Sequence, residues 1–310
     1  IFTTARELDR SHPLANIEQL PRARASRFGP DEPILWIEGR DIVGGSSRWL
    51  PYEFVHTDYT LPPGPASGHF PANTNGLASG NQLLEAVSHG ICEVIERDAI
   101  TLWLQSSERL KRQRVLRLEG VDDAACQELL KQFAQARVNV RVWDTTSDVG
   151  VASFYCLVMG EDDGFVPPEF GSGCHPARQV ALLRALTEAA QARTTYIAGS
   201  RDDFSRGDYS ETARSRRYER CRMLMDAGGE ERNFHEVPNS ESETIREDVD
   251  WIMGRLRSVG IQQVLVVDLT KPEFGIPVVR VVVPGLEGPD TGGRGDYVPG
   301  PRARAARGDL

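Results

Sequence analysis

Two acidic residues, Glu93 and Glu96, stand three positions apart in a stretch with helical periodicity, and Arg97 follows at once. That spacing places both carboxylates on one face of a helix, where they repel each other unless a cation neutralises them. Magnesium takes oxygen ligands and commonly shares one or two carboxylates with nucleotide phosphates, and an arginine can bind phosphate oxygens bidentately. The cluster is consistent with half of a Mg-ATP site, although spacing alone favours a solvated Glu-Glu-Arg face.

A second stretch repeats the pattern with Glu188 and Gln191, which are flanked by Arg184 and Arg193. Both side chains carry oxygen, so a helix there would present two more oxygen ligands on one face. The alternative is a simple helical ion pair between Arg184 and Glu188, which are four residues apart. Taken together, the two helices can supply four oxygens to a pair of magnesium ions that bridge phosphates: Glu93, Glu96, Glu188 and Gln191.

The segment 75–81 precedes the first of these helices and is built of glycines and small residues. Such residues permit close approach of the backbone, and Ser79 or Asn81 is suited to cap the helix. A helix N-terminus at this point favours an anion. The segment is not a Walker A loop, and no dinucleotide-binding glycine fingerprint occurs in the chain.

The elements that must position these residues follow from periodicity and from glycine and proline signals. Residues 34–38 read as a strand that pairs with 49–54, and the proline-rich stretch 60–75 reads as a loop. Two helices and two strands are predicted next, at 81–105, 121–136, 138–143 and 151–159. The same order then recurs around a polar, arginine-rich stretch at 200–240, with helices at 176–198 and 241–259 and strands at 261–268 and 276–283.

The recurrence extends to local sequence, because residues 138–146 resemble residues 263–270. A glycine and a hydrophobic residue open the next strand in both places, at Gly150 and Gly275. We infer an internal duplication with halves at about 76–160 and 176–285, facing each other across a pseudo-twofold axis. Coincidence among common α/β patterns is the alternative.

The composition is that of a globular protein able to bury a core: 310 residues, 40% hydrophobic and 26% charged, with a formal net charge of -9. The negative charge argues against a protein that coats nucleic acid. No apolar run is long enough to span a membrane. Five scattered cysteines argue against a disulfide framework or a structural zinc site, and fit a reducing cytoplasm.

Four longer segments carry a resemblance to a known family. Residues 74–100, 180–203, 276–285 and 297–304 resemble the YcaO family. The closing Gly-Pro-Arg-Ala-Arg, without a Pro-x-Pro-x-Pro tail, is more similar to the TfuA-associated type than to the azoline-forming cyclodehydratases. The resemblance implies one YcaO-type domain over residues 1–310 with an α+β fold, whose duplicated halves carry mixed or antiparallel sheets that face each other across a nucleotide site.

The resemblance also implies a reaction: ATP- and Mg²⁺-dependent phosphorylation of a backbone amide oxygen in a peptide or protein, yielding a thioamide or an azoline. By position, Glu93, Glu96, Glu188 and Gln191 become magnesium ligands. Phosphates are assigned to Arg97, Arg193 and Arg280, and Ser79 is placed near the nucleotide. The expected partners are a peptide or protein substrate and a TfuA-like protein, with no nucleic acid or membrane; a homodimer is left open.

The sequence departs from the family pattern at its start. A Gly-Lys-Gly-type nucleotide segment and another helix with Glu-x-x-Glu-Arg are usual upstream of the strand at 34–39, and neither precedes Ile34. We therefore expect the chain to be N-terminally incomplete or divergent. Two other functions stay open: a non-catalytic accessory protein of a modification complex, and a regulatory ATP-binding module without amide chemistry.

Overall fold

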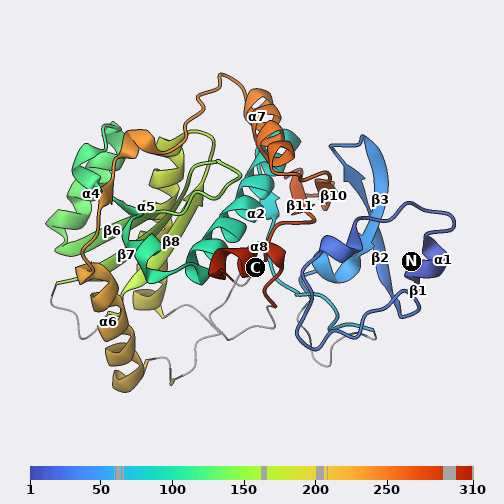
Figure 1. Cartoon of the computed structure of the whole chain (residues 1–310), viewed down its shortest axis with the longest axis horizontal. Coiled ribbons are helices and arrows are strands. Elements are labelled where there is room, and N and C mark those ends of the chain that lie inside the picture. Colours follow the sequence, from blue (N-terminus) through green and yellow to red (C-terminus); the bar gives the residue numbers. More distant parts are fainter. Residues whose placement is uncertain are drawn as a thin grey trace. The chain divides into compact units, whose positions relative to one another are not determined.

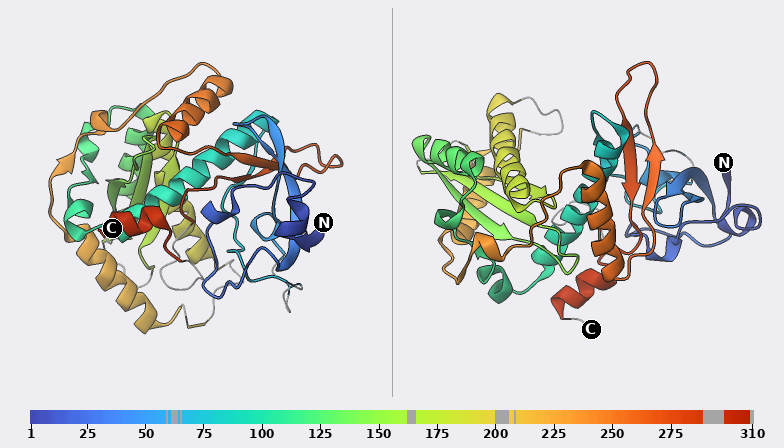
Figure 2. Two further views of the ribbon diagram at one scale, coloured as in Figure 1. Left: turned by 45° about the vertical axis from the view of Figure 1, so that its right-hand side comes forward. Right: turned by 90° about the horizontal axis from the view of Figure 1, so that it is seen from above.

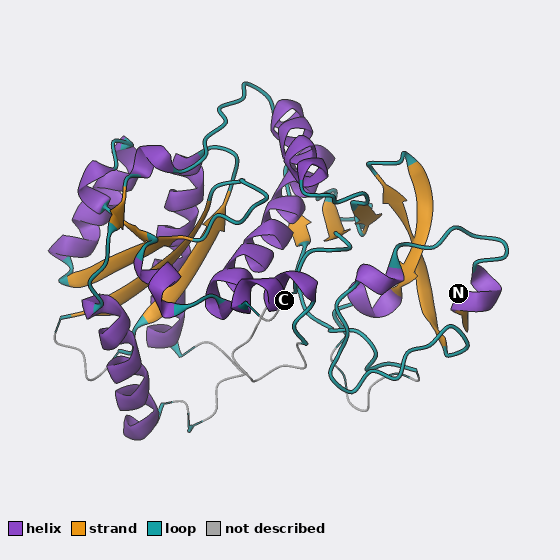
Figure 3. Cartoon of the chain, in the orientation of Figure 1, coloured by secondary structure: helices purple, strands orange, loops and turns teal. Residues whose placement is uncertain are grey.

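The structure is a computed structural model, and it describes residues 1–58, 60, 64, 66–161, 166–199, 206–207, 209–288 and 298–308. The chain forms two compact units. Unit 1 comprises Ile1–Gln105 and Ser242–Leu310, and unit 2 comprises Ser106–Glu241. Figure 1 labels the elements and Figure 3 distinguishes helices from strands. Within the described ranges, every helix is too short or too polar to cross a lipid bilayer.

Unit 1 is built on a six-stranded sheet in the order β1-β2-β10-β11-β4, with β3 also paired to β2. All of these pairings are antiparallel. The hairpin predicted from residues 34–38 and 49–54 is confirmed, except that residues Tyr52–Phe54 form a 3-10 turn rather than strand. The strands are β1 (Phe2–Thr4), β2 (Pro33–Asp41), β3 (Ser46–Pro51), β4 (Leu77–Ser79), β10 (Leu265–Asp268) and β11 (Val278–Val282).

Helix α2 (Leu83–Gln105) packs on the β11–β4 part of this sheet, as the teal helix beside the orange-red strands in Figure 2 shows. Close packing is possible because Gly76 and Gly90 lack side chains at the contact. A Cβ at Gly76 would lie 2.1 Å from the carbonyl oxygen of Val281, and its φ of +79° also favours glycine. Unit 1 further contains α1 (Ala5–Leu8), α7 (Ile245–Ser258) and α8 (Pro301–Arg307).

Helix α8 is tied to α2 by buried charges. Asp98 of α2 accepts hydrogen bonds from Arg302 Nε and Nη2 at 2.9 and 2.8 Å, and from the backbone N–H of Glu287 at 2.9 Å. Glu287 in turn accepts from the backbone N–H groups of Gly300 and Ala303, at the start of α8. These bonds hold the C-terminal helix against the side of α2.

Unit 2 contains a five-stranded sheet in the order β8-β7-β6-β5-β9, antiparallel except for the parallel β5–β9 pair. The hydrophobic core lies between one face of this sheet and helices α4 and α5, with Val142, Phe154 and Leu186 fully buried. The elements are β5 (Val115–Leu116), β6 (Val138–Asp144), β7 (Ser153–Gly160), β8 (Glu169–Cys174), β9 (Glu231–Arg232), α3 (Glu108–Arg112), α4 (Ala124–Gln135), α5 (Arg178–Ala198) and α6 (Glu211–Asp226).

Helix α5 lies unusually close to β8 because Gly171 and Gly173 face it. A Cβ at Gly173 would lie 2.1 Å from the carbonyl oxygen of Ala181, a backbone atom that cannot move independently. We expect Gly173→Ala to destabilise the protein by about 3 kcal/mol, at the upper end of overpacking effects. Gly254→Ala in α7 is the control: nothing lies within 4 Å of a Cβ there, so a gain of about 0.5–1 kcal/mol is expected. Equal urea unfolding midpoints for the two variants would contradict this account.

The two hairpins β6–β7 and β10–β11 share a hydrogen-bond pattern. Asp144 Oδ1 accepts from the N–H of Thr146 at 2.9 Å, and Thr146 Oγ1 accepts from the N–H of Ser153 at 3.1 Å. In the second hairpin, Asp268 accepts from Thr270 at 2.9 Å, and Thr270 Oγ1 accepts from Val278 at 3.1 Å. This shared detail supports the internal duplication inferred from sequence.

Each unit nevertheless combines pieces of both halves. In unit 2, the α4-β6-β7 segment of the first half packs with α5 of the second half and with β8, which lies between the two predicted halves. In unit 1, the α7-β10-β11 segment of the second half packs with β4 and α2 of the first. The predicted halves 76–160 and 176–285 are therefore each divided between the two units. The structure adds elements that were not predicted: strands β1, β4, β5, β8 and β9 and helices α1, α3, α6 and α8.

Candidate nucleotide and magnesium site

The acidic pair predicted on the first helix lies on α2, and Arg97 lies beside both of its members. Arg97 Nη2 is 3.6 Å from Glu96 Oε1, and Arg97 Nε is 4.0 Å from Glu93 Oε1. The side chain of Glu96 is only 10% exposed and that of Glu93 is 21% exposed. A fully solvated acidic face is therefore the wrong description of this helix. Arg97 thus lies beside both members of the acidic pair.

The N-terminal end of α2 differs from the prediction. Ser79 lies in β4, paired with Val278, and the helix begins only at Leu83, so Ser79 does not cap it. Asn81 donates its backbone N–H and its side-chain amide to Glu85. These hydrogen bonds, the backbone one first, lower the pKa of Glu85. Glu85 thus organises the entrance to the helix, and the nucleotide contact of Ser79 stays a prediction.

On α5, Glu188 is held by strand β8 rather than by a neighbouring arginine. Its Oε2 accepts from both the backbone N–H and the Oγ of Ser172, each at 3.1 Å. Arg184 instead donates to the carbonyl oxygen of Cys174 at 3.2 Å. The ion pair between Arg184 and Glu188 is therefore wrong, and among the residues that the structure describes no basic side chain pairs with Glu188.

The carboxylate of Glu188 affects the pKa of a buried cysteine in unit 2. Cys156 of β7 is fully buried, and burial together with the nearby Glu188 carboxylate raises the pKa of its thiol. The thiol therefore stays protonated at neutral pH and acts as a small apolar side chain. Further along α5, Gln191 is exposed and Arg193 is half-buried. Gln191 thus remains accessible to a ligand.

Glu93 and Glu188 occupy equivalent places in their units. Glu93 is followed by Val94, whose side chain lies over Gly76 of the β4 segment. Glu188 is followed by Ala189, whose backbone lies over Gly171 of β8. In each unit, one helix residue touches a glycine of the neighbouring strand segment. The acidic residue is the one that directly precedes this helix residue in the sequence. This equivalence supports the pairing of the two helices that the sequence predicts.

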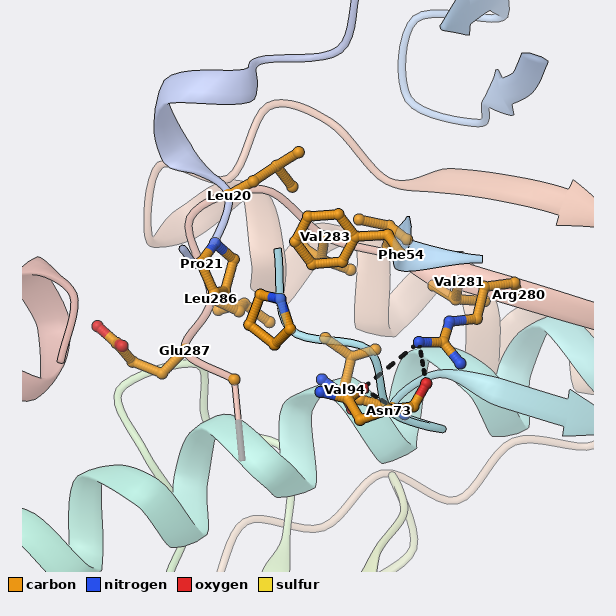
Figure 4. Close-up of a pocket in the computed structure, with 14 residues that line it drawn as sticks. Leu20, Pro21, Phe54, Asn73, Val94, Arg280, Val281, Val283, Leu286 and Glu287 are labelled. Atoms are coloured by element: carbon orange, nitrogen blue, oxygen red, sulfur yellow. Dashed lines mark hydrogen bonds between the residues drawn. The ribbon is translucent and has the colours of Figure 1, made fainter. Parts of the chain in front are cut away.

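Arg280 is deeply buried on β11, where it is 1% exposed. Its Nη2 donates to the carbonyl oxygen of Asn73 at 2.6 Å and approaches Asn73 Oδ1 at 3.4 Å, the dashed lines in Figure 4. Arg280 thereby fixes the loop before β4 on the wall of a pocket lined mainly by apolar side chains such as Leu20, Phe54 and Val94. Asn73 has no sequence signal that would have identified it. The assignment of Arg280 to phosphate stays a prediction.

The predicted ligands fit magnesium by their chemistry. All are oxygen donors: Glu93 and Glu96 in unit 1, and Glu188 and Gln191 in unit 2. Carboxylate and amide oxygens are ligands that suit a hard divalent cation. Within the described residues, no cluster of three or more His, Cys, Asp or Glu side chains stands ready to hold a metal. The four-residue ligand set therefore stays a prediction.

Relatives of the chain are found by sequence. The family model for YcaO cyclodehydratase, ATP- and Mg²⁺-binding, matches residues 2–287. An uncharacterised protein of the tfuA 3′ region of Rhizobium leguminosarum bv. trifolii is 38% identical, covering 88% of this chain and 68% of that protein. An uncharacterised protein of Methanothermobacter thermautotrophicus is 36% identical over 81% of this chain and 65% of its own length.

Solved structures share the fold. The heterocyclase TruD is similar with a TM-score of 0.68 and 23% identity, over 95% of this chain and 43% of that one. The YcaO protein of Methanopyrus kandleri, bound with AMPPCP and Mg²⁺, has a TM-score of 0.64 and 24% identity, over 85% of this chain and 67% of that one. The expected α+β architecture with two sheets is thereby confirmed, and so are ATP and Mg²⁺ as the ligands that the family model names. The chain belongs to the YcaO family.

Proposed function

We propose that this chain takes part in ATP- and Mg²⁺-dependent activation of a peptide backbone amide by phosphorylation of the amide oxygen. The observation that carries the proposal is the pair of equivalent carboxylates, Glu93 and Glu188. Glu93 and Glu96 both lie beside Arg97, and among the described residues no basic side chain pairs with Glu188. The family model, which names ATP and Mg²⁺, supports this assignment.

The chemistry answers a physical problem, because an amide oxygen is a poor leaving group. A nucleophile adds to the carbonyl carbon, the resulting oxyanion takes the γ-phosphoryl group of ATP, and ADP is released. Elimination of phosphate then leaves a thioamide when the nucleophile is sulfide, or an azoline when it is a neighbouring side chain. We favour the thioamide, supported by the closing Gly-Pro-Arg-Ala-Arg and by the relative from the tfuA 3′ region.

In this proposal the acidic residues and Gln191 hold magnesium, which when bound neutralises charge that develops during phosphoryl transfer. Arg97 lies 3.6 and 4.0 Å from its two carboxylates, beyond ordinary hydrogen-bond distance. It is therefore weakly held and can turn its planar guanidinium toward phosphate oxygens. Arg193 is proposed to add a second positive charge from α5. The peptide and a TfuA-like protein are the proposed partners.

The test incubates the full chain with ATP, Mg²⁺, a sulfide source and candidate peptides, with and without a TfuA-like protein. We expect ADP release that depends on peptide and Mg²⁺, and a peptide mass change that corresponds to exchange of oxygen for sulfur. Loss of water instead would identify the azoline product. Mg²⁺-dependent nucleotide binding without any change in peptide mass would favour an accessory or regulatory role, and no such binding would refute the proposal.

A further inference from the structure

Ser172 makes an unusual pair of contacts with one carboxylate oxygen. Both its backbone N–H and its Oγ reach Oε2 of Glu188, each at 3.1 Å. The two donors come from one residue of β8, which is the edge strand of the unit 2 sheet. They converge on a side chain from the neighbouring helix α5. A carboxylate bound in this way has little freedom to rotate about its last bond.

The backbone of β8 makes this contact possible. Gly171 and Gly173 flank Ser172, and a Cβ on either would lie within 2.6 Å of α5 backbone atoms. Because these glycines have no side chains, α5 lies directly on β8. This close packing places Glu188 beside Ser172. Ser172 is thus the one residue of this glycine-rich segment that offers the helix a hydroxyl group.

The second oxygen of Glu188 is in a different position. Within the described residues, the hydrogen bonds of this carboxylate all fall on Oε2, and no basic side chain pairs with it. Arg184, the nearest arginine along the helix, is engaged with the carbonyl oxygen of Cys174. A half-buried carboxylate with one oxygen fixed, and with no cationic side chain paired to it in the described part of the chain, is well suited to offer its other oxygen to a cation.

We propose that Ser172 is a positioning residue for metal binding: it fixes Oε2 of Glu188 and so orients Oε1 toward Mg²⁺. This inference rests on the proposed function, because it takes Glu188 to be a magnesium ligand. Residues that hydrogen-bond to metal ligands fix the ligand's orientation, and their loss typically lowers metal affinity by about 10–100-fold. Magnesium is sensitive to such errors because it demands near-ideal octahedral geometry, whereas calcium tolerates irregular sites.

The experiment compares Ser172→Ala, Ser172→Thr and Glu188→Gln in the full chain, measuring nucleotide binding as Mg²⁺ or Ca²⁺ is titrated. Ser172→Ala keeps the backbone donor, so we expect Mg²⁺ affinity to fall by about 10-fold, at the lower end of the range for such residues. Ca²⁺ affinity should fall less, and Ser172→Thr should restore Mg²⁺ affinity because it keeps the hydroxyl. In a Glu188→Gln background, Ser172→Ala should have no further effect.

Thr187→Ala is the matched control. It removes a hydroxyl from the residue beside Glu188, one that donates only to carbonyl oxygens of its own helix, and should leave both affinities unchanged. An equal loss for Mg²⁺ and Ca²⁺ in Ser172→Ala, or no loss while Glu188→Gln is impaired, would overturn the positioning role. Unchanged Mg²⁺ binding in Glu188→Gln would instead show that the proposed ligand set itself is wrong.

Discussion

Replacing Arg302 with alanine is expected to lower the free energy of unfolding by about 3–5 kcal/mol, the range for breaking a buried ion pair. Asp98 is fully buried on α2, and Arg302 meets both of its oxygens at 2.9 and 2.8 Å. Without the guanidinium, the hydrogen bond that the carboxylate keeps among the described residues is the one from the N–H of Glu287. A buried carboxylate that loses its cationic partner is costly, and the acidic side chain of Glu287 is also buried nearby. Urea unfolding at neutral pH measures the loss.

The pH dependence of this loss follows from the pKa of Asp98. Burial raises that pKa, and Arg302 opposes the rise by hydrogen bonding and by charge. In Arg302→Ala the pKa rises further, so the folded variant binds a proton more tightly than the unfolded chain does. Protonation of Asp98 therefore stabilises the folded variant. This stabilisation is fully present below the pKa of aspartate in the unfolded chain, about 3.9, and it is lost as pH rises through the higher pKa of Asp98 in the folded variant. The deficit relative to the natural protein should therefore grow with pH.

The double variant Asp98→Asn with Arg302→Ala is the control for this prediction. Its asparagine can still accept from the N–H of Glu287 but carries no charge. We expect it to be more stable than Arg302→Ala alone at neutral pH, with a deficit that changes little with pH. Equal stability of the single and double variants would show that lost packing of α8, rather than the buried charge, causes the effect.

The largest expected effect on ligand binding comes from the double variant Glu93→Gln with Glu96→Gln. Glutamine keeps the size of each side chain but removes both charges that the cation is proposed to balance. Because loss of a residue that merely orients a ligand costs about 10–100-fold, loss of two ligands should weaken Mg²⁺-dependent nucleotide binding by more than about 100-fold. Binding without Mg²⁺ should persist, because Arg97 is released from both carboxylates. Nucleotide titrations with and without Mg²⁺ provide the measurement.

Glu85→Gln supplies the matched control on the same helix. Glu85 lies in the first turn and is engaged by Asn81, so its loss should leave the Mg²⁺ dependence unchanged. If instead Glu85→Gln impaired Mg²⁺-dependent binding as strongly as the double variant, general disturbance of α2 would explain both results. If neither variant had an effect, the acidic pair would not be part of the metal site.

The sequence predicted the long helices well because their apolar positions recur over many turns, as in α2 and α5. It missed β8 because Gly171 and Gly173 weaken the strand signal, although those glycines are what bring α5 close. Helix α6 was hidden by its polar, arginine-rich composition, with Cys221 the only residue buried along its described length. The order of strands in each sheet was also beyond reach, since β10 pairs with β2 across most of the chain.

For the site, spacing identified the acidic residues but not their partners. Arg184 and Glu188 have ideal spacing for a helical ion pair, yet a carbonyl oxygen on β8 takes the arginine. The partner of Glu188 is Ser172, whose contact depends on how closely the helix approaches the strand. The sequence pattern did not indicate a role for Asp98, because its ion-pair partner Arg302 lies on α8, far along the chain. Local patterns thus identified the proposed ligands, and tertiary packing decided their neighbours.

Each unit combines segments from both predicted halves of the chain. This arrangement sets the order in which the two units can fold during synthesis on the ribosome. Unit 2 is continuous in sequence, so all of its strands emerge together and can pair at once. The sheet of unit 1 must wait, because β10 and β11 fill the gap between β2 and β4 and are made only after unit 2. Until then the facing edges of β2 and β4 stay open to wrong partners. Helix α2, which carries Glu93, Glu96 and Asp98, therefore reaches its final surroundings last.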